Sequence, residues 1–432
     1  MILDAGLILI LSFVGLLVIG VPIGICIAAS SAVTILLVLP ADIAIFTTAQ
    51  KMVSSLDSFT LLAVPFFILS GVLMNNGGIA LRLVNFAKLF SGRIPGSLAH
   101  TNIVGNMMFG AISGSAIAAS TSIGGVMVPM SEKEGYSRPF SASVNIASAP
   151  TGMLIPPTTA FILYALASGG TSISALFAGG LIAGSLWGGG CILVAYLIAK
   201  SRRYTTRLDL RDSSVQAVIA QALPSLMLIF IIIGGIIFGI FTAVEASAIS
   251  VIYTIFLTMF IYQTIDIKAF LGSLVKATET TGVIMFLLAA SSAMSFAMSI
   301  TGLPAALSSM ILSVSDDPII VLLIITAILL VIGCFMDIGP AILIFTPILL
   351  PIASEIGVNP VHFGIIMVFN LCIGTITPPV GTGLFIGAGI AKEKVENLLL
   401  PLMPFYIVIL AILLLITYVP AVTLFLPRAM GL

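Results

Sequence analysis

The sequence contains one short motif twice, as Gly152-Met153-Leu154-Ile155-Pro156-Pro157 and as Gly374-Thr375-Ile376-Thr377-Pro378-Pro379. Each copy lies within a long apolar stretch. Because proline has no N–H and its ring clashes with the preceding turn, a Pro-Pro pair breaks a helix and frees backbone carbonyls. In a bilayer such a break persists only inside protein or beside a wet cavity. Two broken helices at matching positions of two halves predict the binding site of a secondary transporter.

The composition excludes a soluble domain, since hydrophobic residues make up 60% of the 432 and charged residues only 7%. Apolar stretches of about 18 residues or more recur and predict an all-α polytopic membrane protein. The net charge of zero argues against nucleic acid as a partner. The chain has no Walker motif, no nucleophile–base pair and no metal-ligand spacing, so we expect neither ATP hydrolysis nor enzyme activity. Four widely spaced cysteines are interpreted as small core residues.

The two halves can be aligned without gaps over their central parts. A shift of 222 residues places Pro129 on Pro351, Gly135 on Gly357, Ser115 on Asp337, and each residue of the first motif on its counterpart in the second. This correspondence predicts two repeats, residues 1–200 and 213–432, joined by a cytoplasmic linker at 201–212.

Each repeat is predicted to contain scaffold helices, an amphipathic arm, a re-entrant hairpin with a polar tip, and a broken helix. In the first repeat these are 1–75, 79–93, 101–130 and 140–168; in the second they are 218–300, 303–317, 319–352 and 361–390. We expect polar connections at 40–58 and 266–279, a last span at 402–426, and about ten spans plus two hairpins. Whether 6–39 is one span or two, broken near Gly20-Val21-Pro22, is left open.

Charge patterns indicate that the repeats are inverted in the membrane. The arm at 79–93 is basic, whereas 303–317 is acidic, and basic loops favour the cytoplasmic side. The segments expected inside are 79–93, 131–138, 200–212, 266–276 and 391–396; those expected outside are 40–58, 169–174 and 303–317. The basic cluster from Lys200 to Arg211 could also contact anionic lipid.

Two hairpin tips facing two broken helices would bring oxygen ligands and positive helix N-termini together, which favours sodium beside an anionic solute. Candidate sodium ligands are Ser113, Ser115, Gly152 and Ile155 in the first half, and Asp337, Gly339, Gly374, Thr375 and Thr377 in the second. Candidate substrate contacts are Ser113, Gly114, Ser115, Thr151, Pro156, Pro157, Pro378 and Pro379. The alternative is that these small residues only permit close helix packing.

Asp337 is the most informative single residue, because a carboxylate at membrane depth needs a pairing group or a bound cation. The alternatives to cation binding are that Asp337 lies nearer the water than expected, or that it caps the helix after Gly339. Glu245 could be a coupling group, but we favour a structural role as the cap of a helix restarting after Thr242. His100 and His362 have no second ligand at metal spacing, so both are expected at the surface or the membrane interface.

The motifs together resemble the large membrane subunit of the tripartite ATP-independent periplasmic (TRAP) transporters. The resemblance covers essentially the whole chain and is carried by Phe109 to Ala116, Gly152 to Pro157, Gly239 to Ala246, and Asn370 to Gly381. Two further stretches, Ser55 to Phe59 and Asn145 to Ser148, are most similar to the sialic acid branch. The resemblance implies an elevator mechanism, Na⁺ at the positions named above, a bacterial inner-membrane location, a separate small membrane subunit, and a periplasmic substrate-binding protein.

We therefore expect a sodium-coupled importer subunit for an organic anion, with sialic acid favoured. A C4-dicarboxylate or a sugar acid is the alternative within the class. A stand-alone channel is the alternative from another class, and it would need neither moving hairpins nor a partner. No arginine falls in the two tips, so the sequence does not identify the acid.

Overall fold

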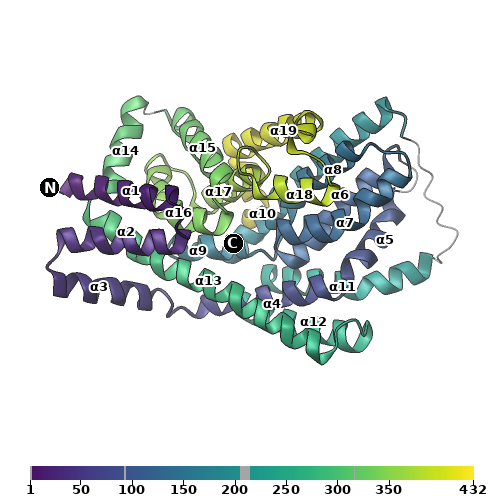
Figure 1. The fold of residues 1–432 in the computed structure, drawn as a ribbon, viewed down its shortest axis with the longest axis horizontal. Coiled ribbons are helices and arrows are strands. Elements are labelled where there is room, and N and C mark those ends of the chain that lie inside the picture. Colours follow the sequence, from purple (N-terminus) through teal and green to yellow (C-terminus); the bar gives the residue numbers. More distant parts are fainter. Residues whose placement is uncertain (1, 92–93, 205–214, 316) are drawn as a thin grey trace.

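The computed structural model describes residues 2–91, 94–204, 215–315 and 317–432, and these form helices (Figure 1). The predicted linker from residue 205 to 212, Arg93 and Asp316 lie outside the described residues. Figure 1 shows α1, α2 and α3 at one end of the molecule and the segment from α5 to α8 at the other.

The first half of the chain contains α1 (Ile2–Val18), α2 (Ile23–Val38), α3 (Ala41–Ser54), η1 (Phe59–Leu62), α4 (Ala63–Asn76), α5 (Ile79–Ser91), α6 (Ser97–Ser113), α7 (Ala116–Lys133), α8 (Arg138–Ser148), η2 (Ala149–Met153), α9 (Thr159–Ala167) and α10 (Ile173–Ser201). The second half contains α11 (Val215–Ile237), α12 (Ala243–Ile255), η4 (Phe256–Ile261), α13 (Ile267–Ile300), α14 (Leu303–Val314), α15 (Pro318–Phe335), α16 (Ile338–Glu355), α17 (Pro360–Thr375), α18 (Thr382–Ala391), α19 (Val395–Tyr418) and α20 (Pro420–Ala429). Within the described residues, eight helical stretches are long and apolar enough to cross a membrane.

The N-terminal apolar stretch is two helices, because α1 ends at Val18 and α2 begins after Pro22. Three predicted boundaries were wrong. The expected connection at 40–58 is largely the helix α3, which starts after Pro40. The expected connection at 266–279 belongs to the continuous helix α13, where the charged residues lie on an exposed face, with Lys276 3.9 Å from Glu279. The last span is divided at Pro420, whose missing N–H separates α19 from α20.

Helix bounds in the two halves agree closely at the shift of 222 residues. The second helix of each hairpin, α7 or α16, has 18 residues, and the next helices begin at Arg138 and Pro360. A glycine with positive φ follows each hairpin, Gly135 at 84° and Gly357 at 81°. Both positions require a left-handed backbone, which glycine adopts without steric conflict.

The hairpins and the broken helices pack across the two halves. The first hairpin's α7 contacts α18 of the second broken helix, and the second hairpin's α16 contacts α9 of the first. A separate group forms around α13, which packs against α2, α3 and α4, while α4 also contacts α12. The site elements therefore form one interlocked group beside a scaffold of long helices.

Glycines permit each hairpin to lie directly on the break of its own half. A Cβ placed on Gly110 of α6 would overlap the backbone of Gly152, and a Cβ on Gly374 would overlap that of Gly333 in α15. These contacts join backbone to backbone, so no flexible side chain can move aside. Close packing through small residues is the usual device for helix association in membranes.

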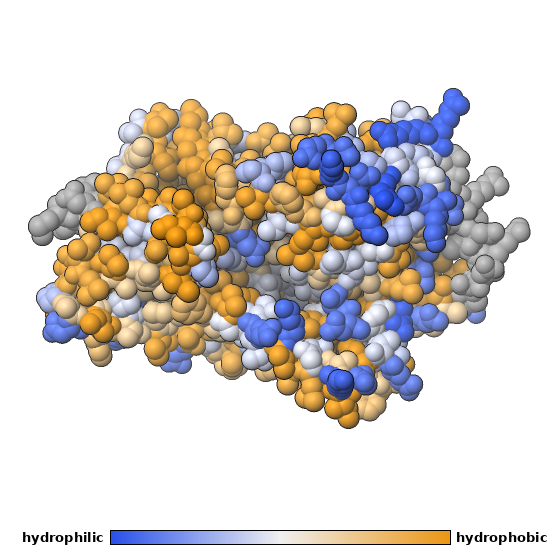
Figure 2. All heavy atoms as spheres, viewed as in Figure 1, coloured by the Kyte–Doolittle hydropathy of each residue, from blue (hydrophilic) through white to orange (hydrophobic). Residues whose placement is uncertain are grey.

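The surface separates into apolar and polar regions, as Figure 2 shows. The visible face over α1, α2, α14 and α15 is mainly hydrophobic, and hydrophilic residues gather over the end that carries α7 and α8. Large side chains such as Leu11, Leu323 and Val331 are exposed. An apolar exterior of this extent fits contact with lipid rather than water.

We predict that Gly110→Ala lowers the thermal unfolding midpoint of the detergent-purified protein, because overpacking a rigid contact costs about 1–3 kcal/mol. The matched control is Gly125→Ala, since Gly125 is exposed in α7 and an added Cβ there meets nothing within 4 Å. The control should lose no stability. Equal midpoints for the two variants would contradict the close approach of α6 to the first break.

Candidate functional site

The tip of the first hairpin is the turn between α6 and α7. Gly114 ends α6 in the left-handed conformation, with φ 61°, and Ser115 caps α7 by accepting a hydrogen bond from the Ala118 N–H at 3.3 Å. The Ser113 hydroxyl is 3.5 Å from the Ser115 carbonyl. A Cβ on Gly114 would lie 3.4 Å from the Pro157 carbonyl oxygen, so this tip is adjacent to the first break.

The first broken helix has carbonyls without donors. After η2 the N–H groups of Leu154 and Ile155 both donate to the Thr151 carbonyl, and Thr158 then caps α9. Among the described residues, none donates a hydrogen bond to the carbonyls of residues 154–157. The Pro156–Pro157 peptide bond is cis, as is Pro378–Pro379. Four free carbonyls in a buried segment are hard oxygen ligands of the kind that alkali and alkaline-earth cations prefer.

The tip of the second hairpin carries the only acid of the two tips. Asp337 occupies the N-cap position of α16, but its side chain makes no capping hydrogen bond and no ion pair with the described residues. The capping alternative is therefore wrong. Asp337 is exposed, and it lines a cavity. No group of three or more His, Cys, Asp or Glu that could hold a metal occurs in the part of the chain described here.

The second break is fixed from two sides. The Tyr406 hydroxyl of α19 donates to the Ile376 carbonyl, and the Gly381 N–H donates to the Cys334 carbonyl of α15 at 3.2 Å. The hydroxyls of Thr375 and Thr377 donate to carbonyls one turn back, each at 2.7 Å. Their lone pairs remain available as acceptors.

One cavity of about 1410 Å³ brings both tips together. Its lining includes the two tips, Met153 and Pro157 beside the first break, and scaffold residues of α2, α4 and α13. Its only charged lining residues are Asp337 and Glu279, and neither Lys nor Arg appears among the described residues that line it. The cavity lies between the interlocked hairpin group and the scaffold.

The predicted residues divide between this cavity and the protein interior. Those that line the cavity are Ser113, Gly114, Ser115, Pro157, Asp337 and Gly339. Those that are buried and do not belong to its lining are Thr151, Gly152, Ile155, Pro156, Gly374 and Thr375. The second motif's Thr377, Pro378 and Pro379 are partly or fully exposed and lie outside this lining. The structure therefore brings the two tips and the first break together at the cavity. The second break is connected to the cavity only through its contact with α15, the first helix of the second hairpin.

A buried amide cluster fixes the first hairpin to the first broken helix. The Asn106 amide donates to Asn102 Oδ1 at 2.9 Å, to Asn145 Oδ1 at 3.0 Å and to Ser148 Oγ at 2.8 Å, and the Asn145 amide donates to Ser120. All five residues are buried. Asn106 Oδ1 has no donor among the described residues, but the other hydrogen bonds of this network join α6, α7 and α8.

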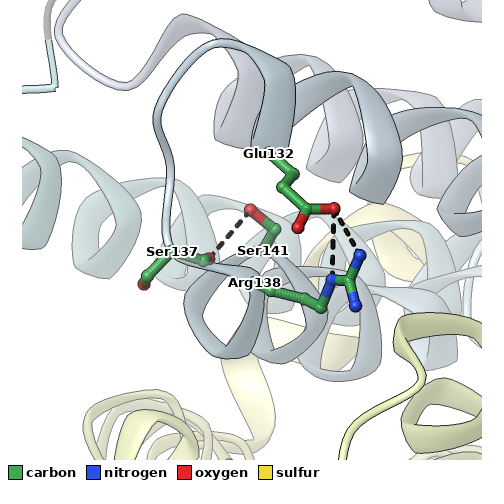
Figure 3. A network of polar contacts seen from close by, with 4 residues as sticks. All are labelled: Glu132, Ser137, Arg138 and Ser141. Atoms are coloured by element: carbon green, nitrogen blue, oxygen red, sulfur yellow. Dashed lines mark hydrogen bonds and ion pairs between the residues drawn. The ribbon is translucent and has the colours of Figure 1, made fainter.

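The far end of the same hairpin has its own contacts, drawn in Figure 3. Arg138, at the start of α8, binds Glu132 Oε2 at 2.6 Å, and the Ser141 hydroxyl donates to the Ser137 carbonyl at 3.2 Å. The ion pair is partly exposed, so it contributes at most about 1 kcal/mol. It nevertheless fixes the register between α7 and α8.

Both histidines are buried, which corrects the expected surface or interface location. His100 Nε2 lies 3.0 Å from the Pro95 carbonyl oxygen, and His362 Nδ1 lies 2.7 Å from the Thr423 hydroxyl. Hydrogen-bond partners inside the protein make such burial tolerable. Glu245 has the expected structural role, because its carboxylate and Thr242 form a capping box at the start of α12.

Scaffold contacts to the first hairpin were missed from the sequence. The Ser122 hydroxyl of α7 donates to Asn75 Oδ1 of α4, and a Cβ on Gly71 would lie 2.8 Å from the Ser113 carbonyl oxygen. Glu279 lines the cavity from α13. The polar residues Asn75 and Asn76 at the end of the span could have indicated a polar contact there. The sequence did not indicate which hairpin would supply the partner.

The described residues form a helical membrane-protein fold with a large internal cavity. The YdaH transporter of Alcanivorax borkumensis has a similar fold, with a TM-score of 0.65, 13% identity, and coverage of 88% of this chain and 89% of that one. Residues 10–422 match the family described as "Tripartite ATP-independent periplasmic transporter, DctM component". The chain belongs to this family of TRAP large permeases, which are transporters and not enzymes, and it is a multi-pass protein of the bacterial inner membrane.

Three relatives extend over nearly all of this chain. The YgiK protein of Salmonella typhimurium is 50% identical, with 96% of this chain and 95% of that one covered. The isethionate TRAP permease DctMQ of Oleidesulfovibrio alaskensis is 38% identical over 95% of this chain and 64% of its own length. The sialic acid TRAP large permease SiaM of Vibrio cholerae is 35% identical over 97% of both chains.

We predict that Tyr406→Phe destabilises the purified protein by about 1–3 kcal/mol, since it leaves the Ile376 carbonyl without its donor. Tyr196→Phe is the control, because the described residues offer its hydroxyl no hydrogen-bond partner. Thermal unfolding should separate the two variants. If both unfold at the wild-type temperature, Tyr406 does not support the second break.

Proposed function

We propose that this TRAP large permease uses a sodium gradient to import an organic anion through the central cavity. The observation that carries the proposal is the charge of the lining, which contains Asp337 and Glu279 but no basic side chain. An anion is repelled by such a lining unless cations enter with it. Sodium ions at the tips would supply that compensating charge.

The proposed sodium ligands are those predicted from the sequence. In the first half the free carbonyls around Gly152 and Ile155 lie beside the tip that carries Ser113 and Ser115. In the second half Asp337 and Gly339 line the cavity, while Gly374, Thr375 and Thr377 border the break attached to α15. A cavity-lining carboxylate with no ion pair among the described residues is the group expected to bind a cation.

We further propose an elevator-type movement by two inverted repeats. The hairpins and broken helices interlock across the halves through the contacts of α7 with α18 and of α16 with α9. Such a unit would move as one body against the scaffold helices around α13. The matched helix bounds support a repeat, and the charge asymmetry of the two arms supports inversion.

Sialic acid is the substrate that we propose first. The motif resemblance at Ser55 to Phe59 and Asn145 to Ser148 favours it, and the cavity of about 1410 Å³ is large enough for a nine-carbon acid. C4-dicarboxylates, sugar acids and isethionate are the competing candidates, because relatives of similar identity carry different substrate names. The expected partners are a small membrane subunit, a periplasmic binding protein and surrounding lipid.

We predict sodium-gradient-dependent uptake in proteoliposomes that contain this chain and its small subunit, with the cognate binding protein outside. The assay should compare N-acetylneuraminate, succinate, isethionate and a sugar acid. Uptake of one acid that requires both sodium and the binding protein supports a carrier. Flux of solute without either requirement would instead identify a channel.

We predict that Asp337→Ala and the isosteric Asp337→Asn reduce sodium-dependent uptake to near background, since both remove the cavity's central negative charge. Asp42→Asn, on exposed α3, is the control and should transport normally. The sodium concentration for half-maximal uptake should rise for any residual activity of Asp337→Asn. Unchanged sodium dependence would remove Asp337 from the cation site.

A further inference from the structure

A second cavity, of about 770 Å³, lies between the scaffold and the hairpin group. Ten of its twenty-two lining residues are serine or threonine, and none of the described residues that line it is charged. The hydroxyls come from separate elements, including Ser58 and Thr60 near α4, Thr171 and Ser174 near α10, and Ser292 and Ser295 of α13. Hydroxyls from separate elements that converge on one hollow can bind a solute rich in hydroxyl and carboxylate oxygens.

The backbone around this cavity carries positive partial charge. The first turn of η1, which continues into α4, and the first turn of α10 both belong to its lining. Helix N-termini carry a positive partial charge from unpaired N–H groups. The α12 N-terminus is already capped by Glu245, and at α10 the Ser172 hydroxyl accepts a hydrogen bond from the Ala175 N–H at 3.2 Å. The N-terminus in the lining that has no side-chain cap is that of η1. With no acidic side chain in the lining, the cavity favours an anion.

Basic residues lie at the far end of α10 and, in α5, beside the far end of α4. Lys51 of α3 instead lies near the cavity, with its ammonium 5.0 Å from the centre of the Phe296 ring. The last turn of α10 contains Lys200, followed by Arg202, and Arg82 lies over the Tyr262 ring at 3.8 Å where α4 and the α12–η4 segment both end. Basic residues concentrate on the cytoplasmic side of a membrane protein. On the position of Lys200 and Arg202 we assign the second cavity to the periplasmic side, from which an importer receives its solute.

The two cavities meet at α16 but are separated there. Leu343 belongs to both linings, and the Ser291 hydroxyl of α13 donates to the Leu343 carbonyl at 2.5 Å. The side chain of Ser291 is buried. A solute in the second cavity is thus close to the hairpin group, on the other side of the Ser291–Leu343 contact from the central cavity.

We propose that the second cavity is an external binding site for a hydroxyl-bearing carboxylate, occupied before the solute reaches the central cavity. The inference rests on the proposed import function. It adds a binding site, a side of the membrane and a chemical class of ligand. The helix N-termini bind the carboxylate, and the surrounding hydroxyls bind the hydroxyl groups of the solute.

The test uses single cysteines in a full-length chain whose four native cysteines are replaced by alanine, co-expressed with its small subunit. Ser292→Cys places a thiol in the cavity. Ser299→Cys is the control, because Ser299 is exposed on the same helix, seven residues further on, and does not line the cavity. Ser295→Cys replaces the first variant if that variant does not fold.

Membrane-impermeant methanethiosulfonates, one sulfonate and one trimethylammonium, are added outside right-side-out vesicles. We expect Ser292→Cys to react from outside, with an anion-over-cation rate ratio several-fold above that of Ser299→Cys. N-acetylneuraminate should slow labelling at Ser292→Cys more than succinate does, and should leave Ser299→Cys unaffected. Labelling only from inside, equal rate ratios, or labelling that neither solute slows would each overturn the inference.

The labelling result is independent of transport. Sodium-dependent uptake without anion-selective labelling at Ser292→Cys would reject the external site and leave the proposed function intact. Anion-selective, solute-protected labelling without sodium-dependent uptake would reject the proposed coupling and leave the site intact.

Discussion

Backbone carbonyls that lack donors inside an apolar protein are the constraint on which this structure depends. At each Pro-Pro pair the helix ends and its last carbonyls have no N–H within the helix. An unsatisfied polar group in an apolar environment is costly, so the protein must surround the break or place it beside a polar cavity. The first break is buried against α6 and borders the central cavity, whereas the second is bound by α15 and α19.

This constraint explains why glycine pairs recur where hairpins meet breaks. An interrupted segment can be surrounded only if neighbouring backbones approach closely, and Gly110 with Gly152, or Gly333 with Gly374, permits that approach. The exchange of contacts between α7 and α18 and between α9 and α16 then makes the hairpins and broken helices one unit. Packing thus converts two local breaks into a shared structure that can border a cavity.

The sequence predicted those features whose cause is local. The prolines predicted where the helices break, and glycine and serine predicted the hairpin turn. The Thr242–Glu245 spacing predicted a capping box. Features that depend on distant partners were missed. His362 is buried between the Thr423 hydroxyl, 2.7 Å from its Nδ1, and the Thr417 carbonyl oxygen, 3.3 Å from its Nε2, and both partners lie more than fifty residues further along the chain. The charged residues early in α13 led us to predict a connection. The structure shows instead that they share one exposed face of a continuous helix, which the sequence alone did not indicate.

The two copies of the motif are not equivalent in chemistry, although they align residue by residue. At the position where the second half has Tyr406, the first half has Gly184, and a Cβ on that glycine would meet the Ile155 side chain. The counterpart of Ile155 is Thr377. A tyrosine hydroxyl therefore satisfies the Ile376 carbonyl at the second break, whereas an apolar side chain packs at the first, where the corresponding Leu154 carbonyl has no donor among the described residues. The acidic tip at Asp337 and Pro157 of the first break therefore line the cavity from different halves of the chain. The cavity lining thus combines residues of both halves, and it differs in chemistry between the two copies of the motif.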